Sequence, residues 1–443
     1  MTTAKESEDL TRVGPGTVMG EFMRQYWLPA AMSSELKADG DPMRLMLLGE
    51  KLIAFRDSSG RVGVMDHRCP HRCASLFFGR NEENGLRCIY HGWKYDVTGA
   101  CVDMPNVSER QDFKQKVRAK AYRAEERNGL IWVYMGARQT APPLPGLEAN
   151  LLPEGELAMK FILRECNWLQ AMEGDIDTSH FGFLHVGGIE PEEVPEDHPV
   201  YGAVLHRSPE YHMREMPFGT QYAAHRPSGD GRTYWRFANF LFPFWTQQPQ
   251  GAFQTHINAR AWVPLDDTHT MFVSLQWEPE QLKQRLTGTA RLKDGRTLPG
   301  ARMGHDFLPN TTDWLGRWRL RGNASNDYQI DREAQRGGGI YSGITDIHLQ
   351  DQAVTESMGG IVDHGFETLA PSDLMIARTR RRLLRVARDC RDGVTPPGVD
   401  DPEVFMTARS GFFVEDPAVD WQAAYDQQVE QAARPAVVPA AAE

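Results

Sequence analysis

Short apolar runs separated by turn residues dominate the first third of the chain. Four of them, rich in aliphatic and aromatic residues, lie at 45–48, 51–55, 62–65 and 130–134. Runs of this length bounded by turn residues predict strands. We therefore expect an all-β module between about residues 27 and 136. The proline-rich stretch 141–146 that follows predicts a linker.

The pattern changes beyond this linker. Residues 165–184 predict a helix, followed by a Pro/Glu-rich loop at 187–199. Longer apolar runs suit an antiparallel sheet, and they lie at 233–242, 252–262 and 270–277. Helical segments close the chain. Seven arginines fall between Arg378 and Arg391, and the apolar side of this segment favours an amphipathic helix with a solvated basic face over a docking surface for an acidic partner.

Composition sets bounds on the class of protein. The 443 residues are 41% hydrophobic and 25% charged, which is typical of a globular chain of about two domains. A net charge of -11 argues against nucleic acid as a partner. No apolar stretch is long enough for a membrane span, and the N-terminus has no apolar signal core, so we expect a cytoplasmic protein. Six cysteines are too few for a disulfide scaffold, and four are expected to be reduced, buried thiols: Cys73, Cys101, Cys166 and Cys390.

Two mixed Cys/His pairs are the most informative chemical feature. Sixteen residues separate the pair Cys69 and His71 from the pair Cys88 and His91. Two thiolates and two imidazoles suit either tetrahedral zinc or a Rieske 2Fe–2S cluster. Zinc fingers usually place both cysteines before both histidines, whereas here each pair can give one residue type to each of two metals.

The longer stretches 69–76 and 88–96 resemble the two cluster-binding loops of the Rieske non-heme iron oxygenases. The resemblance implies a 2Fe–2S cluster with Cys69 and Cys88 on one iron and His71 and His91 on the other. A structural zinc knuckle and a chance cluster of buried residues are the alternatives. Neither of them explains the rest of the chain.

A second constellation lies at 167–185. On an ideal helix one stripe holds Asn167, Gln170, Glu173, Asp177 and His180. Such a stripe is ordinarily a solvated face, but this one carries acidic groups and histidine instead of a Lys/Glu mixture. His180 and His185 would point about 140° apart on an ideal helix. They converge only if the helix bends or ends, which Gly182 allows.

Two histidines plus a distant carboxylate form the facial triad of non-heme Fe(II) oxygenases. The spacing of Asp177, His180 and His185 also resembles the mononuclear-iron motif of the family. That resemblance implies that the histidines bind iron and that Asp177 connects His180 to a cluster histidine of a neighbouring subunit. Residues 347–359 resemble the phthalate dioxygenase branch, which implies Asp351 as third ligand. Spacing alone leaves rivals open: Asp346, Asp363, Asp373 and His348. His364 departs from that branch, where an arginine is expected.

The resemblance covers nearly the whole chain and implies an α+β protein of the phthalate 4,5-dioxygenase type. Its expected parts are an N-terminal segment over 1–26 that packs near the catalytic domain, an all-β Rieske domain over 27–136, a helix-grip catalytic domain over 137–430 and a disordered tail over 431–443. The family forms trimers or stacked trimers, which we expect here too.

The implied activity is dihydroxylation of an aromatic carboxylate ring with O2. A separate flavin/iron–sulfur reductase would pass electrons from NADH to the cluster and then to the mononuclear Fe(II). A monooxygenase that performs O-demethylation or ether cleavage of an aromatic acid is the first alternative. A non-catalytic electron carrier is the second.

Three arginines of the predicted sheet region are candidates to clamp a substrate carboxylate: Arg207, Arg226 and Arg236. Ordinary salt bridging is the alternative for each. Arg236 is the best candidate because strand alternation can turn it inward. An apolar wall suited to a ring, or plain core, is expected from Phe240, Phe242, Phe244 and Trp245.

Overall fold

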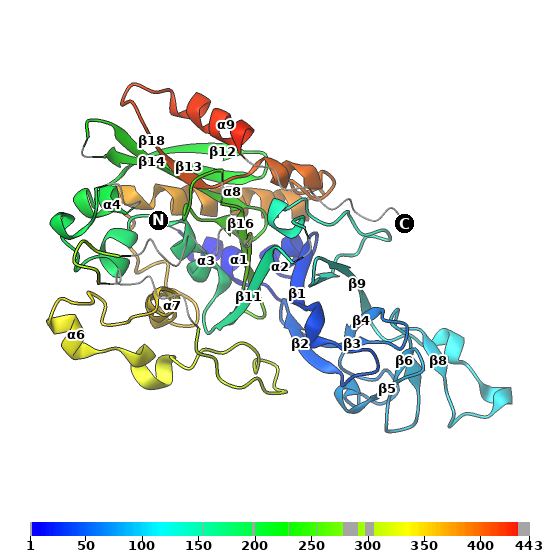
Figure 1. Cartoon of the computed structure of the whole chain (residues 1–443). Helices are drawn as coiled ribbons and strands as arrows, with labels where there is room; N and C mark the ends of the chain where they lie inside the picture. Colours follow the sequence, from blue (N-terminus) through cyan, green and yellow to red (C-terminus); the bar gives the residue numbers. More distant parts are fainter. Residues whose placement is uncertain are drawn as a thin grey trace.

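The computed structural model of the chain describes residues 2–153, 155–196, 200–228, 230–254, 256–277, 291–296 and 305–432. The predicted tail over 431–443 lies outside these residues from 433 onward, as do residues 197–199 of the predicted loop. Three antiparallel sheets form the framework of the described part. Two come from the first third of the chain and one from the remainder (Figure 1). The α+β prediction is confirmed.

The first two sheets confirm the all-β prediction. The larger has the strand order β1-β10-β9-β4-β3-β2, and the smaller has the order β5-β6-β7-β8. Their strands are β1 (Trp27–Met32), β2 (Met43–Leu47), β3 (Glu50–Arg56), β4 (Val62–Asp66), β5 (Arg80–Glu82), β6 (Gly85–Arg87), β7 (Lys94–Tyr95), β8 (Cys101–Asp103), β9 (Ala121–Arg127) and β10 (Leu130–Tyr134). The four predicted runs coincide with β2, β3, β4 and β10.

The third sheet has the order β11-β17-β16-β15-β14-β13-β12, and β18 pairs with the free length of β14. Its strands are β11 (Leu157–Arg164), β12 (Glu210–Met216), β13 (Gly219–Pro227), β14 (Thr233–Leu241), β15 (Trp245–Gln247), β16 (Asn258–Pro264), β17 (Thr270–Trp277) and β18 (Gly411–Glu415). The prediction at 252–262 is wrong in its first half, because β16 begins only at Asn258. The other two predicted runs are confirmed.

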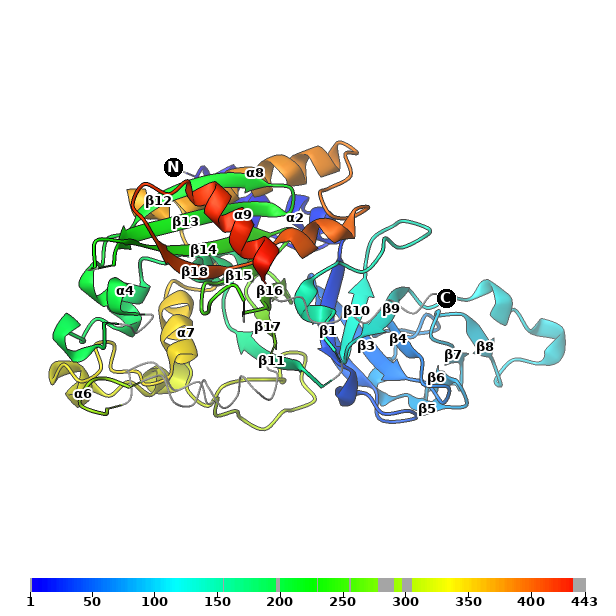
Figure 2. The ribbon, with the colours of Figure 1, turned by 45° about the horizontal axis from the view of Figure 1, so that its top comes forward.

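Helices cover both faces of this sheet. The α-helices of the described residues are α1 (Ala4–Thr11), α2 (Val18–Met23), α3 (Trp168–Ile176), α4 (Tyr201–Leu205), α6 (Arg332–Arg336), α7 (Ile347–Ser357), α8 (Leu374–Arg391) and α9 (Trp421–Gln431), of which α6 lies away from the sheet. Trp235 of β14 packs against Trp421 and Phe237 packs against Tyr425, both on α9, which crosses the sheet in Figure 2. Ala238 and Phe240 alternate to the opposite face and join the core that α3 and α8 cover. No described helix has the length and apolar character required to cross a membrane.

One hydrophobic core runs through the six-stranded and the third sheet and includes residues of α1 and α2. The backbone N–H of Leu48, between β2 and β3, donates to the carbonyl of Pro264 at the end of β16 (3.0 Å). An ion pair between Arg317 and Glu35 (2.6 Å) is a second contact between the two halves of the chain. The predicted domain division at residues 136 and 137 therefore stays a prediction, since packing is continuous there.

Some positions differ in burial from the sequence-based expectation, whereas the polar stripe was an open question. Asn167, Gln170 and Glu173 of this stripe are buried, so it is not the solvated face that such a stripe ordinarily forms. Arg380 of α8 is also buried, because its guanidinium bonds the carboxylates of Glu173 (2.5 Å) and Glu367. The described cysteines are all free, and four of the six are buried, but Cys73 is exposed and Cys390 is partly exposed. The amphipathic helix itself is confirmed as α8.

Candidate metal centres and active site

The two Cys/His loops have the same backbone conformation. In each loop the cysteine N–H donates to the carbonyl five residues later (2.8 Å), and the cysteine carbonyl accepts from the N–H four residues later (2.9 Å). The residue four positions after the cysteine is left-handed in both: Cys73 has φ 59° and Gly92 has φ 81°. The loops therefore present Cys69 and Cys88 as equivalent positions of a two-loop clamp.

The side chains of the two loops meet in pairs, thiol beside thiol and imidazole beside imidazole. The thiols of Cys69 and Cys88 are buried, whereas the imidazoles of His71 and His91 lie nearer the surface with ring centroids 4.4 Å apart. The buried Nδ1 of His91 has no hydrogen-bond partner among the described residues. A buried nitrogen without a partner is costly unless something else binds it, so this donor set suits a metal group between the loops.

The predicted helix at 165–184 is interrupted. α3 ends at Ile176, Asp177 is extended (φ -94°, ψ 109°), and a π-helical turn spans Phe181–His185. The N–H of Val186 donates to the carbonyl of Phe181 (3.3 Å), the five-residue spacing of a π-turn. Two histidines that an α-helix would point apart therefore face each other.

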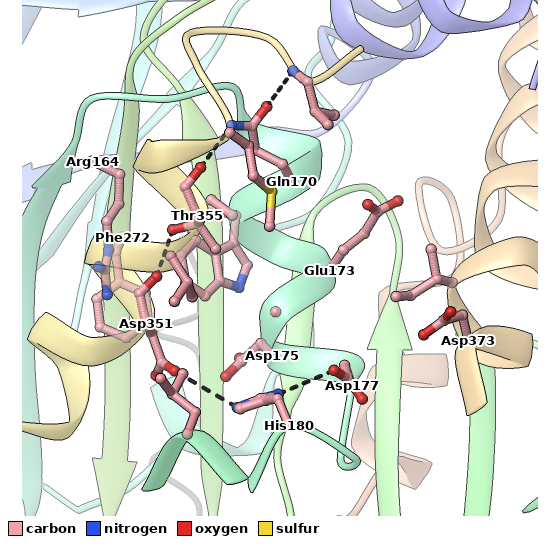
Figure 3. A pocket seen from close by; sticks show the side chains of 18 of the residues that line it. Arg164, Gln170, Glu173, Asp175, Asp177, His180, Phe272, Asp351, Thr355 and Asp373 are labelled. Atoms are coloured by element: carbon pink, nitrogen blue, oxygen red, sulfur yellow. Dashed lines mark hydrogen bonds and ion pairs between the residues drawn. The ribbon is translucent and has the colours of Figure 1, made fainter. Parts of the chain in front are cut away.

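His180, His185 and Asp351 form a cluster of potential ligands. The Nε2 atoms of the two histidines are 3.1 Å apart, and Oδ1 of Asp351 lies 3.3 Å from His185 Nε2 and 3.6 Å from His180 Nε2. Burial acts to raise the pKa of Asp351, but the adjoining imidazoles of His185 and His180 hold it well below its usual range. Figure 3 shows Asp351 and His180 pointing at one another from α7 and from the loop after α3.

The outer nitrogens of both histidines are also bonded. Nδ1 of His180 lies 3.3 Å from Oδ2 of Asp177, and Nδ1 of His185 lies 2.6 Å from Oε1 of Gln350. Since a carboxylate and an amide oxygen can only accept, each Nδ1 carries a proton in the neutral imidazole. Two lone pairs and a carboxylate oxygen then meet at one point. A cation there would relieve the repulsion, so the donors fit a metal ion.

Comparison with known proteins identifies the family. The family described as LigXa C-terminal domain like matches residues 133–442, and the Rieske [2Fe-2S] domain matches residues 26–119. The 3-chlorobenzoate-3,4-dioxygenase oxygenase subunit of Comamonas testosteroni is 52% identical over 433 residues, 97% of this chain and 99% of that protein. The chain belongs to the Rieske non-heme iron oxygenases. The phthalate 4,5-dioxygenase oxygenase subunit of Pseudomonas putida is 33% identical over 95% of this chain and 94% of its own length.

Solved structures of Rieske oxygenases share the fold. Pseudomonas putida CBB5 NdmB superposes with a TM-score of 0.56 at 18% identity, covering 90% of this chain and 99% of its own. Dicamba monooxygenase bound to dicamba gives a TM-score of 0.53 at 16% identity, over 84% of this chain and 99% of its own. As a member of this family the chain uses a Rieske 2Fe–2S cluster and a mononuclear iron, with electrons supplied from NADH by a separate reductase.

Two cavities adjoin the His180–His185–Asp351 cluster of this Rieske oxygenase. The larger, of about 250 Å³, lies between α3, α7 and the sheet, and its apolar walls include Trp262, Phe272 and Met358. The smaller, of about 80 Å³, extends toward β13 and β14. Both are bordered by Asp177, His180 and Asp351. A mostly apolar space beside a polar cluster suits an aromatic ring with one reactive edge held near the metal.

The three candidate arginines differ in position. Arg236 is buried on the inner face of β14, lines the smaller cavity, and donates to the carbonyl of Pro249 (3.2 Å). Arg207 and Arg226 donate to the backbone carbonyls of residues 189 and 206 and line neither cavity. Burial lowers the pKa of Arg226 to about 10. The apolar wall expected from residues 240–245 is core, because none of these residues lines either cavity.

The rivals of Asp351 have other positions. Asp346 caps α7 by accepting the N–H of Leu349 (2.9 Å), and Asp363 accepts the N–H of Gly365 (2.9 Å). Asp373 and His348 line the larger cavity, and His348 also lines the smaller one. His364 is buried beside Ser7 (2.7 Å) and lines neither cavity.

Two polar residues at the site were not predicted. Arg260 of β16 lines both cavities and pairs with Asp175 (2.5 Å), and Gln350 bonds His185. Neither stands out in the sequence, because a single Arg in a strand or Gln in a helix is usually a surface residue.

Proposed function

We propose that this oxygenase dihydroxylates the ring of an aromatic carboxylate such as a phthalate or a benzoate. The observation that carries the proposal is the convergence of His180, His185 and Asp351 beside an apolar cavity of about 250 Å³. The two relatives named above act on 3-chlorobenzoate and phthalate. An electron carrier would not need the second donor set, which argues against that alternative.

The proposed cluster ligands are Cys69 and Cys88 on one iron and His71 and His91 on the other. Buried thiols and outward imidazoles suit this division, because the histidine-bound iron is then the one nearer the surface. Trp93 stacks on His71 with centroids 4.3 Å apart and limits its rotation.

The proposed mononuclear-iron ligands are His180, His185 and Asp351, a facial set that leaves coordination positions open. Bound iron would supply activation of O2 there. The carboxylate of Asp177 accepts a hydrogen bond from the Nδ1–H of His180 and so keeps the Nε2 lone pair directed at the metal position. The apolar walls of the larger cavity exclude water from the ring that is to react.

Electron transfer is proposed to occur between copies of the chain in a trimer or in stacked trimers. Figures 1 and 2 show the β5–β8 sheet at one end of the molecule and α3 and α7 in the other half. The tip of the Rieske half is the loop that holds Cys88 and His91, and it exposes Ile89 (63%) and Tyr90 (54%). Exposed Met358 (48%) and Leu369 (39%) lie at the rim of the larger cavity. These two apolar surfaces suit each other. The tip of one copy would then meet Asp177 of the next.

The reductase is proposed to be a separate flavin/iron–sulfur protein, as the resemblance implies. The cytoplasmic location expected from the N-terminal sequence stays a prediction.

Arg236 is proposed to hold the substrate carboxylate, since its guanidinium is buried beside the proposed iron ligands and has the fork geometry that matches a carboxylate. Its Nε has no hydrogen-bond partner among the described residues. Arg207 and Arg226, which line neither cavity, are weaker candidates.

Iron analysis and labelled oxygen test the proposal. About three irons per chain without zinc are expected, two for the cluster and one for the mononuclear site, whereas about two would fit a carrier. Turnover of 3-chlorobenzoate or phthalate under labelled O2 should give a cis-diol with two labelled atoms. A single labelled atom in the product would reject dioxygenation in favour of the monooxygenase alternative.

A further inference from the structure

Gln350 has an unusual position for a neutral amide. It lies on α7 immediately before Asp351 and is 1% exposed. Its Oε1 lies 2.6 Å from Nδ1 of His185, and its Nε2 lies 2.6 Å from the carbonyl oxygen of Ile344. Both ends of the amide are therefore engaged at short distance.

These two contacts leave only one arrangement of hydrogens. The carbonyl of Ile344 can only accept, so the amide NH2 of Gln350 must face it. The amide oxygen must then face His185, and an oxygen acceptor requires a proton on Nδ1 of that ring. The Nε2 of His185 is left with its lone pair, 3.3 Å from Oδ1 of Asp351 and 3.1 Å from Nε2 of His180.

The support of the two histidines is unequal. His180 bonds the carboxylate of Asp177, whereas His185 bonds a neutral amide, so the second histidine is oriented without a further negative charge beside the metal position. Since Gln350 and Asp351 are neighbours on α7, any shift of this helix moves one ligand and the support of another together.

From these contacts we infer that Gln350 is a positioning residue of the metal site: it fixes the tautomer and ring plane of His185, and through them the affinity for the mononuclear metal. The inference rests on the proposed assignment of His180, His185 and Asp351 as ligands. It extends that assignment to a residue that touches neither metal nor substrate.

The test measures metal binding instead of turnover. Full-length protein with its cluster intact, freed of mononuclear iron by mild chelation, is titrated with Co(II) by calorimetry. Gln350→Leu removes the acceptor at similar volume and should weaken Co(II) binding by about tenfold or more. Gln350→Glu keeps an acceptor oxygen for Nδ1 of His185 but loses the donor to the carbonyl of Ile344. Its Co(II) affinity should therefore fall between that of Gln350→Leu and that of wild type.

Gln352→Leu is the matched control, because Gln352 is on the same helix, is 2% exposed and does not bond a proposed ligand. It should leave Co(II) affinity within about twofold of wild type. Co(II) affinity of Gln350→Leu equal to that of Gln352→Leu would overturn the inference. The EPR spectrum of the Fe(II)–nitric oxide complex is a second readout, and it should change in Gln350→Leu but not in the control.

The failure of the ligand assignment itself looks different. If His185→Ala binds Co(II) as tightly as wild type, the proposed ligand assignment is wrong, and the inference about Gln350 fails with it. If His185→Ala loses the metal while Gln350→Leu keeps it, only the positioning role fails.

Discussion

Replacement of Asp177 by Asn isolates its proposed connecting role from metal binding. Oδ1 of Asp177 accepts the N–H of Ser179 (2.7 Å), while Oδ2 accepts from Nδ1 of His180 (3.3 Å). Burial acts to raise the pKa of Asp177, but the hydrogen bond and charge of His180 lower it overall, so the group is a carboxylate at neutral pH. An asparagine offers one acceptor instead of two and loses the charge.

The size of the effect follows from the bonds that are lost. One charge-assisted bond contributes about 1.5–3 kcal/mol, and the proposed bond to a cluster histidine of a second copy would contribute a similar amount. Since about 1.4 kcal/mol corresponds to a tenfold change in rate, Asp177→Asn should lower coupled turnover at least about 10²-fold. Both metal centres should stay loaded, because none of their proposed ligands changes.

Single-turnover reoxidation of the reduced cluster is the direct assay. Reduced enzyme is mixed with O2 and 3-chlorobenzoate, and cluster absorbance is followed while iron content is measured in parallel. Asp373→Asn is the control, since this residue also borders the larger cavity, and its carboxylate accepts the N–H of Ala370 at the surface and bonds none of the proposed ligands. Reoxidation of Asp177→Asn within about threefold of the control would refute the connecting role.

Three further predictions concern the cluster, the substrate and pH. The hydroxyl of Tyr95 lies 3.3 Å from Sγ of Cys69, a proposed cluster ligand. Tyr95→Phe removes a bond worth about 1 kcal/mol that favours the reduced cluster, so a redox titration should show a potential lower by roughly 40 mV. An unchanged potential would contradict this. Arg236→Gln should raise KM for 3-chlorobenzoate about tenfold or more but should leave KM for its methyl ester unchanged. Arg226→Gln is the control. An equal rise in KM for the acid and the ester would exclude Arg236 as the carboxylate clamp. The side-chain bond to Asp266 raises the pKa of His269. The stabilisation of the fold by protonated His269 is therefore full below about pH 6.5 and is lost as pH rises through the folded-state pKa. His269→Gln should lower Tm more at pH 6 than at pH 8, and a pH-independent difference in Tm would contradict this prediction.

The cluster loops were predictable because their chemistry is local. Cys69, His71, Cys88 and His91 come in two short loops, and the spacing within each is itself the signal. Asp351 was different, since its convergence with two histidines far earlier in the chain depends on the fold, and only the resemblance to a known branch selected it.

The remaining errors arise from tertiary context. The periodicity at 165–184 shows an amphipathic helix but not the break at Asp177, which the π-turn after it requires. The spacing of the polar stripe left its burial open, because Arg380, the buried partner of Glu173, is 207 residues away in the chain. Gln350 gave no signal because its role depends on which atoms its amide meets.

The continuous core between the six-stranded and the third sheet has a consequence for how electrons travel. A redox domain on a free linker can swing between donor and acceptor, but here Leu48, Pro264, Glu35 and Arg317 fasten the Rieske half to the other. In the trimer or stacked trimers proposed above, the distance that an electron must cross is then fixed when the copies assemble. Dilution that separates the copies should therefore stop oxygenation even though each chain stays folded and fully loaded with iron.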